Sequence, residues 1–335
     1  MNPKIKMIDR LICDQVKLFP DFPHNDDGLR EVINQIVTGK PGRRMAKLYK
    51  CLVESFIMVG GSDQSNQGYY DRQKTKPSYH RIKQAVKQAA CPKLASFETY
   101  QDCGYRKTAK TCNNPDLIAA CPVPQLDMKK GVLNQMAFSL FFFLRDVCKG
   151  DFYRFVRDQF GDGALPEEEL TDRIQGFIAQ VSRIKNVGPK LVDMVFSHIF
   201  FTQAPGWDYQ AIGVRMVAID TLVHNFLAKT GTLDYYGKPH KYGPKCHSQA
   251  GCVGVIEEVA RDLDCRKYHP SYPAYFPRLI QVYIWAYCAM NGENICNGNK
   301  CKTGNPNMAC SLLQEGYCQP IPLSQPDPNL VVRAA

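Results

Sequence analysis

The 335-residue sequence predicts a mostly α-helical fold. Apolar residues recur every three or four positions through most of the chain, which is the spacing of one helix face, and no long segment alternates with the period of a β-strand. Proline and glycine separate the helical segments. Hydrophobic residues make up 44% of the chain, which is enough to fill a sizeable core. The length allows two or three domains, or one large helical domain.

Four helices are expected in the first 90 residues, over Lys6–Phe19, Leu29–Val37, Met45–Val59 and Ser78–Ala90. Each has apolar residues at helical spacing, and proline or glycine follows the first two. The polar loop GGSDQSNQGYY comes after the third helix. Such a loop is either an ordinary surface connection or a segment that reaches into nucleic acid.

The helical pattern gives way to a loop-rich stretch at residues 91–124. It contains four cysteines, Cys91, Cys103, Cys112 and Cys121. Cys91 and Cys121 are each followed by proline, which is common beside iron–sulfur ligands. The spacing fits no short metal-binding motif, so metal ligation and free or buried thiols both stay open. Helical patterning resumes over Lys130–Lys149 and Asp151–Phe160.

Two apolar helices joined by a tight turn follow. The first starts at the acidic run Glu167–Glu169, which suits a helix N-terminus, and the turn is Asn186–Gly188. Pro189 opens the second helix, and Lys190 comes directly after it. A glycine lets another molecule approach the backbone closely, and the N–H groups at the start of a helix attract anions. This turn is therefore a candidate contact for a phosphate.

Charge favours a polyanionic partner. The chain has 42 basic and 32 acidic residues, a net charge of +10. The basic residues gather in four stretches, Lys40–Lys50, Arg72–Lys87, Arg183–Lys190 and Lys238–Lys245. Such stretches are typical of nucleic-acid-binding surfaces, although a solvated basic surface gives the same composition.

No segment resembles a signal peptide, and the longest apolar run, Met136–Leu144, is too short to span a bilayer. We therefore expect an intracellular protein with no membrane partner. Fifteen cysteines in such a chain indicate metal ligation more than disulfides, because reducing compartments do not maintain structural disulfides.

Two further groups of possible metal ligands lie late in the chain. Four cysteines follow an apolar helix that carries Trp285, and they are Cys296, Cys301, Cys310 and Cys318. They lie in a loop rich in glycine, asparagine and proline, which can wrap a metal centre. A looser group comprises Cys246, His247, Cys252 and Cys265. It could extend a metal site or arise by coincidence in a cysteine-rich chain.

Asp220 precedes a helix that is expected to begin at Thr221, in the sequence VAIDTLVHNFL. As the residue before the helix, it suits an N-cap whose carboxylate accepts from the first N–H groups. Capping alone is a sufficient structural explanation for an aspartate at this position.

The segments NVGPKLVDMV and VAIDTLVHNFL resemble the helix-hairpin-helix and aspartate signature of the endonuclease III and 8-oxoguanine DNA glycosylase superfamily. Val187, Gly188, Lys190 and Asp220 match that signature. Asn186 replaces the first glycine of the turn, and asparagine tolerates left-handed backbone conformations better than most residues. The order of hairpin, aspartate and terminal cysteines also matches the family.

The sequence departs from the family in two places. Lys190 and Asp220 are thirty positions apart, whereas the family has fewer than about twenty. Asp208 is closer to the usual spacing, but it lacks the apolar approach and the following helix of Asp220. The intervals between the four terminal cysteines are four, eight and seven residues, whereas the family has about six, two and five.

The resemblance implies a two-lobed helical DNA glycosylase fold with a helix-hairpin-helix motif and a cysteine-rich metal-cluster loop. The expected parts are a helical, cysteine-rich region over residues 1–130, a helix-hairpin-helix domain over 131–230, a metal-cluster domain over 231–320, and a tail over 321–335. It further implies that the four terminal cysteines bind a [4Fe–4S] cluster, with zinc or no metal as the alternatives.

The implied activity is removal of a damaged or modified base from double-stranded DNA by a monomeric enzyme that flips the base out of the duplex. Lys190 is the expected nucleophile of a bifunctional glycosylase and AP lyase, and Asp220 stabilises the developing charge. The turn at Asn186–Gly188 is expected to hold a phosphate, and Gln64 or Gln67 to fill the gap left by the base. The alternatives are a monofunctional glycosylase, in which Asp220 activates water, and a DNA-binding module without chemistry.

Overall fold

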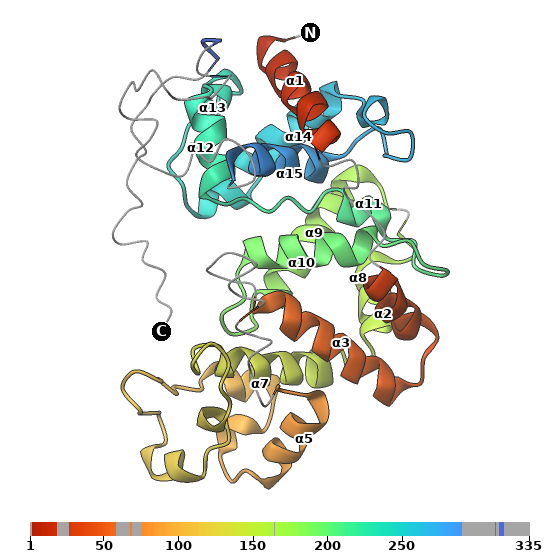
Figure 1. The fold of residues 1–335 in the computed structure, drawn as a ribbon. Coiled ribbons are helices and arrows are strands. Elements are labelled where there is room, and N and C mark those ends of the chain that lie inside the picture. The colour runs from red at the N-terminus through yellow and green to blue at the C-terminus, as the bar shows by residue number, and fades with distance from the viewer. Residues whose placement is uncertain are drawn as a thin grey trace. The chain divides into compact units, whose positions relative to one another are not determined.

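A computed structural model of the chain describes residues 2–18, 27–57, 68, 76–163, 165–289, 312 and 315–317 (Figure 1). The prediction of a mostly α-helical protein is confirmed, because these residues form helices, turns and two isolated β-bridges, without a β-strand. No helix within the described ranges is long and apolar enough to cross a membrane. The specific glycosylase fold stays a prediction.

The chain divides into two compact units. Unit 1 comprises residues 1–24 and 213–334, and unit 2 comprises residues 25–212. Their placement relative to each other is not determined. The division at residues 130, 230 and 320 that the sequence suggests stays a prediction.

Unit 2 contains the predicted helix-hairpin-helix segment and most of the helices that the structure describes. Its elements are α2 (Asp27–Thr38), α3 (Pro41–Phe56), α5 (Tyr79–Gln88), η1 (Pro92–Leu94), α6 (Phe97–Gln101), η2 (Pro115–Ala120), η3 (Val123–Gln125), α7 (Asn134–Phe142), η4 (Phe143–Val147), α8 (Phe152–Phe160), α9 (Glu167–Val181) and α10 (Pro189–Phe201). The short helix α11 (Gln210–Gly213) ends at the boundary with unit 1. Helix α7 packs against α3, α5 and α6, and all of its side chains except one are buried.

The two helices of the hairpin contribute the aromatic core of unit 2. Phe177 of α9 meets Phe196 and Phe200 of α10, with ring centroids 5.0 and 5.2 Å apart. Trp207 stacks on Phe200 and donates its indole N–H to the Ile199 carbonyl at 2.9 Å. Burial of these rings fixes the hairpin on the unit, so the turn between α9 and α10 has a rigid base.

Unit 1 is built around its last long helix. Its elements are α1 (Pro3–Leu18), α12 (Thr221–Lys229), α13 (Thr232–Tyr235), η5 (Pro244–His247), α14 (Cys252–Asp262), η6 (Cys265–Lys267) and α15 (Pro277–Cys288). Helix α15 packs against α1, α12 and α14, as Figure 1 shows. Cys288, the last residue of α15, is fully buried. The first helix of the chain thus completes a unit that otherwise comes from the last third of the sequence.

Candidate metal centre and nucleic-acid interface

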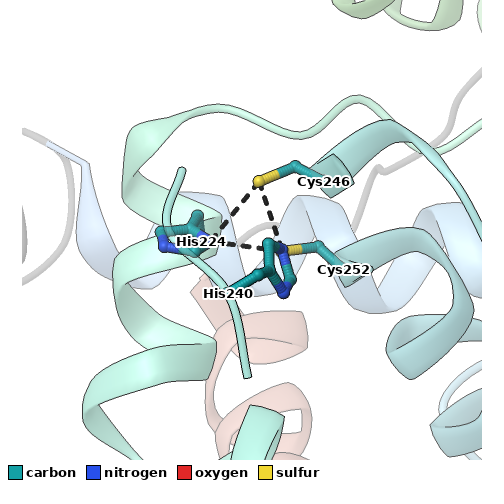
Figure 2. Close-up of side chains that lie close together, drawn as sticks. All are labelled: His224, His240, Cys246 and Cys252. Carbon is teal, nitrogen blue, oxygen red and sulfur yellow. Dashed lines mark hydrogen bonds between the residues drawn. The ribbon is translucent and has the colours of Figure 1, made fainter. Parts of the chain in front are cut away.

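Four potential metal ligands converge in unit 1. They are His224, His240, Cys246 and Cys252, and their ligand atoms all lie within 4.8 Å of one another. Figure 2 shows the four side chains pointing toward a common centre from α12, a loop, η5 and α14. Three of them are buried and His240 is half-buried. This group could bind a metal ion.

Each of the four segments has a local reason for its position. Helix α12 begins at Thr221 because the Asp220 carboxylate accepts from the Val223 N–H at 3.0 Å. Helix α13 ends in a tight turn in which Gly237 has a left-handed backbone (φ 65°) and the Lys238 N–H donates to the Leu233 carbonyl at 2.8 Å. This turn reverses the chain, so the loop that follows returns to α12.

A close approach of backbone to backbone brings the two cysteines together. A Cβ atom on Gly251 would lie 1.9 Å from the Lys245 carbonyl oxygen and 3.2 Å from the Cys246 Cα. No side chain other than hydrogen fits there. Gly251 is also the residue before α14, so Cys252 stands at the first position of that helix. The glycine therefore allows η5 to lie directly against the start of α14.

The sulfur–nitrogen distances are those of a metal-ligand tetrahedron. The Nδ1 atom of His224 lies 3.4 Å from the Cys252 sulfur and 3.5 Å from the Cys246 sulfur. The Nε2 atom of His240 lies 3.4 Å from each of the same two sulfurs. Tetrahedral zinc with ordinary Zn–S and Zn–N bonds separates sulfur from nitrogen by about 3.6 Å. Four near-equal separations indicate one shared centre better than separate hydrogen bonds, because each ring nitrogen has a single proton or lone pair to offer.

Atoms around the four side chains orient them for metal binding. The Nδ1 atom of His240 lies 2.7 Å from the Lys238 carbonyl oxygen. A proton held there leaves the lone pair of Nε2 directed at the two sulfurs, which is the usual arrangement behind a metal-bound histidine. The Gly243 N–H points at the Cys246 sulfur at 3.4 Å, and backbone donors of this kind stabilise thiolates.

The two thiols shift each other's pKa in opposite directions. A hydrogen bond from Cys252 lowers the pKa of the Cys246 thiol, and His224 and the Gly243 N–H add to the effect. The same contact and burial raise the pKa of the Cys252 thiol. Metal ligation requires deprotonated cysteines, so binding of a divalent ion would release protons.

Tyr242 joins the metal-binding group to Asp220. Its ring packs edge-on against His224, with centroids 5.7 Å apart. Burial raises the pKa of Tyr242 to about 12, and the negative charges of Asp220, Cys246 and Cys252 contribute. In addition, His224 lies one helical turn after Asp220, and the backbone N–H of His224 donates to the backbone carbonyl of Asp220 at 3.0 Å. The position of Asp220 therefore depends on the same helix that carries a ligand.

The group coincides only in part with the ligands expected from the sequence. Cys246 and Cys252 come together, whereas His247 and Cys265 of the looser predicted group do not belong to it. The two histidines were not foreseen. The spacing His-x5-Cys-x5-Cys over 240–252 is a usable signal, but His224 belongs to an apolar helix face and gives none.

Six of the predicted site residues lie outside the described residues, and their assignments stay predictions. They are Gln64, Gln67, Cys296, Cys301, Cys310 and Cys318.

The predicted phosphate-binding turn has the backbone expected of it. Asn186 is left-handed (φ 63°), a conformation that asparagine tolerates better than most residues, and it is exposed. Val187 is buried and anchors the turn. Gly188 is exposed and caps α10, and nothing lies within 4 Å of the place that a Cβ atom would occupy. The chain thus presents bare backbone to solvent at the start of a 13-residue helix.

Basic residues beside the turn already have partners within unit 2. The Arg183 guanidinium pairs with Glu98, and the Lys185 ammonium donates to the Gln101 carbonyl at 2.6 Å. The Lys185 N–H donates to the hydroxyl of Ser139 on α7 at 3.0 Å. These contacts hold the segment before the turn against α6 and α7.

The two predicted catalytic residues belong to different units. Lys190 is exposed in the first turn of α10 in unit 2, and Asp220 is half-buried in unit 1. Their action on one substrate therefore stays a prediction. The prediction that Asp220 caps a helix is confirmed. Asp208, the alternative aspartate, is exposed in unit 2 and precedes no helix directly.

Comparison with known proteins gives no family for this chain. No protein-family model, no curated protein and no solved structure matches it.

Proposed function

We propose that this protein is a DNA glycosylase with AP lyase activity, in which the turn between α9 and α10 contacts the DNA backbone and Lys190 is the nucleophile. The observation that carries the proposal is the backbone of that turn. Left-handed Asn186 and open, exposed Gly188 stand at the start of α10, with Lys190 one residue beyond Pro189. This is the arrangement that a phosphate contact followed by a reactive amine requires.

The chemistry needs an amine close to the deoxyribose of a flipped nucleotide. The Lys190 nitrogen, as free amine, bonds to C1′ while the glycosidic bond breaks, and the base leaves with the bonding electrons and takes up a proton. Ring opening then gives a Schiff base at C1′. Loss of a C2′ proton and of the 3′ phosphate by β-elimination nicks the strand. Asp220 has the proposed role of stabilising positive charge on the sugar.

We further propose that His224, His240, Cys246 and Cys252 bind structural zinc. Two cysteines and two histidines whose ligand atoms all lie within 4.8 Å of one another are a donor set that zinc prefers, and three of the four are buried. All four positions are supplied by the protein, so no coordination site is left for a substrate. The ion holds α12, η5 and α14 together and with them the helix that Asp220 caps.

A DNA-binding module without chemistry is the second candidate. One observation favours it: the Asp220 carboxylate has a complete structural role as the cap of α12. The monofunctional glycosylase, in which Asp220 activates water, is the third. The three differ in whether a base is released and whether the protein bonds covalently to DNA.

The test incubates the full chain with duplexes that carry oxidised, mismatched or modified bases and adds borohydride, which reduces a Schiff base to a stable adduct. Wild type is compared with Lys190→Ala, Asp220→Asn and the control Lys6→Ala, which removes an exposed lysine of α1 outside the four basic stretches. Asparagine caps helices about as well as aspartate, so Asp220→Asn removes the charge and keeps α12.

We expect adducts with wild type and Lys6→Ala, none with Lys190→Ala, and at least 100-fold slower base release with Asp220→Asn, which is about 3 kcal/mol of transition-state stabilisation. Adducts that persist in Lys190→Ala would exclude Lys190 as the nucleophile. Base release without adducts would support the monofunctional enzyme. DNA binding with no release from any duplex would support the binding module.

A further inference from the structure

We propose that a second group, Cys91, Cys103, Cys112 and Cys121 of unit 2, holds a [4Fe–4S] cluster. This site is separate from the His/Cys group of unit 1 and from the cysteines after residue 290, and it is independent of any action on DNA. All four are free cysteines with partly exposed side chains. The argument rests on three sets of contacts that bring residues distant in sequence into one place.

The first set joins Cys103 to Cys112. Arg106 and Thr111 form an antiparallel bridge, with N–H to carbonyl distances of 2.8 and 3.4 Å, so the chain on either side of residues 107–110 runs side by side. The Asn113 side-chain amide donates to the Asp102 carbonyl at 3.1 Å. A Cβ atom on Gly104 would lie 2.0 Å from Asn113 Oδ1. The residues that flank Cys103 and Cys112 are therefore in direct contact.

The second set joins Cys91 to Cys112 through Asn114. Its backbone N–H lies 3.3 Å from the Cys112 sulfur, and its side-chain nitrogen lies 4.0 Å from the Cys91 sulfur. Hydrogen bonds from amide groups to cysteine sulfur are a regular feature of iron–sulfur sites, where they stabilise the negative charge. One asparagine thus faces two of the four sulfurs.

The third set joins Cys103 to the segment after Cys121 through two neighbouring residues at the start of α7. Gln135 donates to the Cys103 carbonyl at 3.2 Å and lies 3.9 Å from its sulfur. The buried Asn134 side chain donates to the carbonyls of Val123 and Leu126 at 2.9 and 2.7 Å. Both loops are therefore fixed to the same end of one buried helix.

The surroundings of the sulfurs favour an iron–sulfur cluster over a single zinc ion. Amide nitrogens of Asn114 and Gln135 face the sulfurs of Cys91, Cys103 and Cys112, and such contacts are typical of iron–sulfur sites. Proline after Cys91 and Cys121 is also common beside iron–sulfur ligands.

The local fold gives such a cluster a structural role. Between Cys91 and Gln125 the chain forms only η1, α6, η2 and η3, none longer than six residues. Short helices contribute little stability alone, and metal ligation can supply what a small core lacks. The cluster would bond the loops to one another around the start of α7.

The test is metal and sulfide analysis of the full chain purified without oxygen. The variants are Cys103→Ser/Cys121→Ser, Cys246→Ser/Cys252→Ser, Cys301→Ser/Cys310→Ser and the control Cys13→Ser, which changes an exposed cysteine of α1. We expect the first double variant to lose about four irons and four sulfides per chain and the matching visible absorbance, whereas the control and the unit 1 double variant keep them. Loss of all iron only with Cys301→Ser/Cys310→Ser would overturn the proposal. A colourless wild type whose zinc falls by one ion in the first double variant would also overturn it.

A second measurement uses only the wild type, so its result does not depend on whether the variants fold correctly. The coloured protein is treated with iodoacetamide before and after cluster removal by an oxidant and chelator, and the alkylated cysteines are mapped by mass spectrometry. We expect Cys91, Cys103, Cys112 and Cys121 to be at least tenfold slower to react before removal than after it, while Cys13 reacts equally in both. Equal rates for the four before and after removal would contradict the proposal.

Discussion

Replacing Gly251 with alanine should disrupt the unit 1 metal centre without removing a ligand. The added Cβ would lie 1.9 Å from the Lys245 carbonyl oxygen, whereas non-bonded carbon and oxygen atoms need about 3.5 Å. The backbone before Cys246 must therefore move by roughly 1.6 Å. Metal–ligand distances tolerate only about 0.2 Å. Neither neighbour can give way by rotating a side chain, because both contacting groups are backbone.

We expect the metal affinity to fall by about 100-fold, which corresponds to about 3 kcal/mol of binding free energy. This is the upper end of the range of about 10- to 100-fold that is typical of changes to residues behind the ligands. Competition with a chromogenic chelator measures the affinity, and elemental analysis gives the metal per chain. Thermal unfolding with and without chelator should show that wild type loses stability on metal removal and that Gly251→Ala loses less, because it has less bound metal to lose.

The matched control is Gly176→Ala in α9. Nothing lies within 4 Å of its Cβ position, and its backbone is helical. Alanine there should leave metal binding unchanged and stabilise the helix by about 0.5–1 kcal/mol. Wild-type metal affinity in Gly251→Ala would refute the close approach of η5 to α14 on which the site is built.

Three further predictions concern single residues. Asn186→Ala should destabilise unit 2 by roughly 1 kcal/mol and Asn186→Gly should not, because the residue is left-handed; urea unfolding measures both. Asp220→Ala should weaken metal binding and stability by about 1 kcal/mol through loss of the α12 cap, whereas Asp220→Asn should match wild type in both; equal losses would contradict the capping role. Burial alone would raise the pKa of the Asp9 carboxyl group. The hydrogen bond from Lys267 helps to outweigh burial, so the pKa of Asp9 in the folded protein lies below its usual value of about 3.9. The ionised carboxylate therefore contributes its full stabilisation above about pH 3.9 and loses it as the pH falls through its lower pKa in the folded state. Asp9→Asn should reduce the free energy of unfolding by about 1 kcal/mol at pH 7 and by progressively less below pH 4, as measured by denaturant titration.

Local sequence patterns were sufficient to predict the two helices joined by the turn at Asn186–Gly188 and the capping role of Asp220. The acidic run at Glu167, the turn residues and Pro189 mark the ends of α9 and α10 through backbone preferences that act over a few positions. The same holds for Asp220, whose carboxylate caps the helix that follows it directly. The left-handed backbone of Asn186 likewise reflects a preference of the residue itself.

The metal centre could not be predicted in full, because its ligands meet through tertiary packing. Fifteen residues separate His224 from His240, and His224 is one turn into a helix whose other buried residues are mainly apolar. No periodicity distinguishes a ligand from a core histidine in that setting. The contact between η5 and α14 depends on Gly251, whose importance appears only when the Lys245 carbonyl is seen against it. Two of the four ligands were therefore identified from the sequence as possible ligands and two were not.

The most direct test of the proposed function is to identify the residue that carries the covalent adduct. Wild-type protein is reduced with borohydride on a cleaved duplex and digested, and the modified peptide is sequenced by mass spectrometry. The account predicts a single modified site, the side-chain nitrogen of Lys190, within the peptide that spans the start of α10. A modified N-terminal amine, a different lysine, or no adduct on any duplex from which a base is released would contradict it.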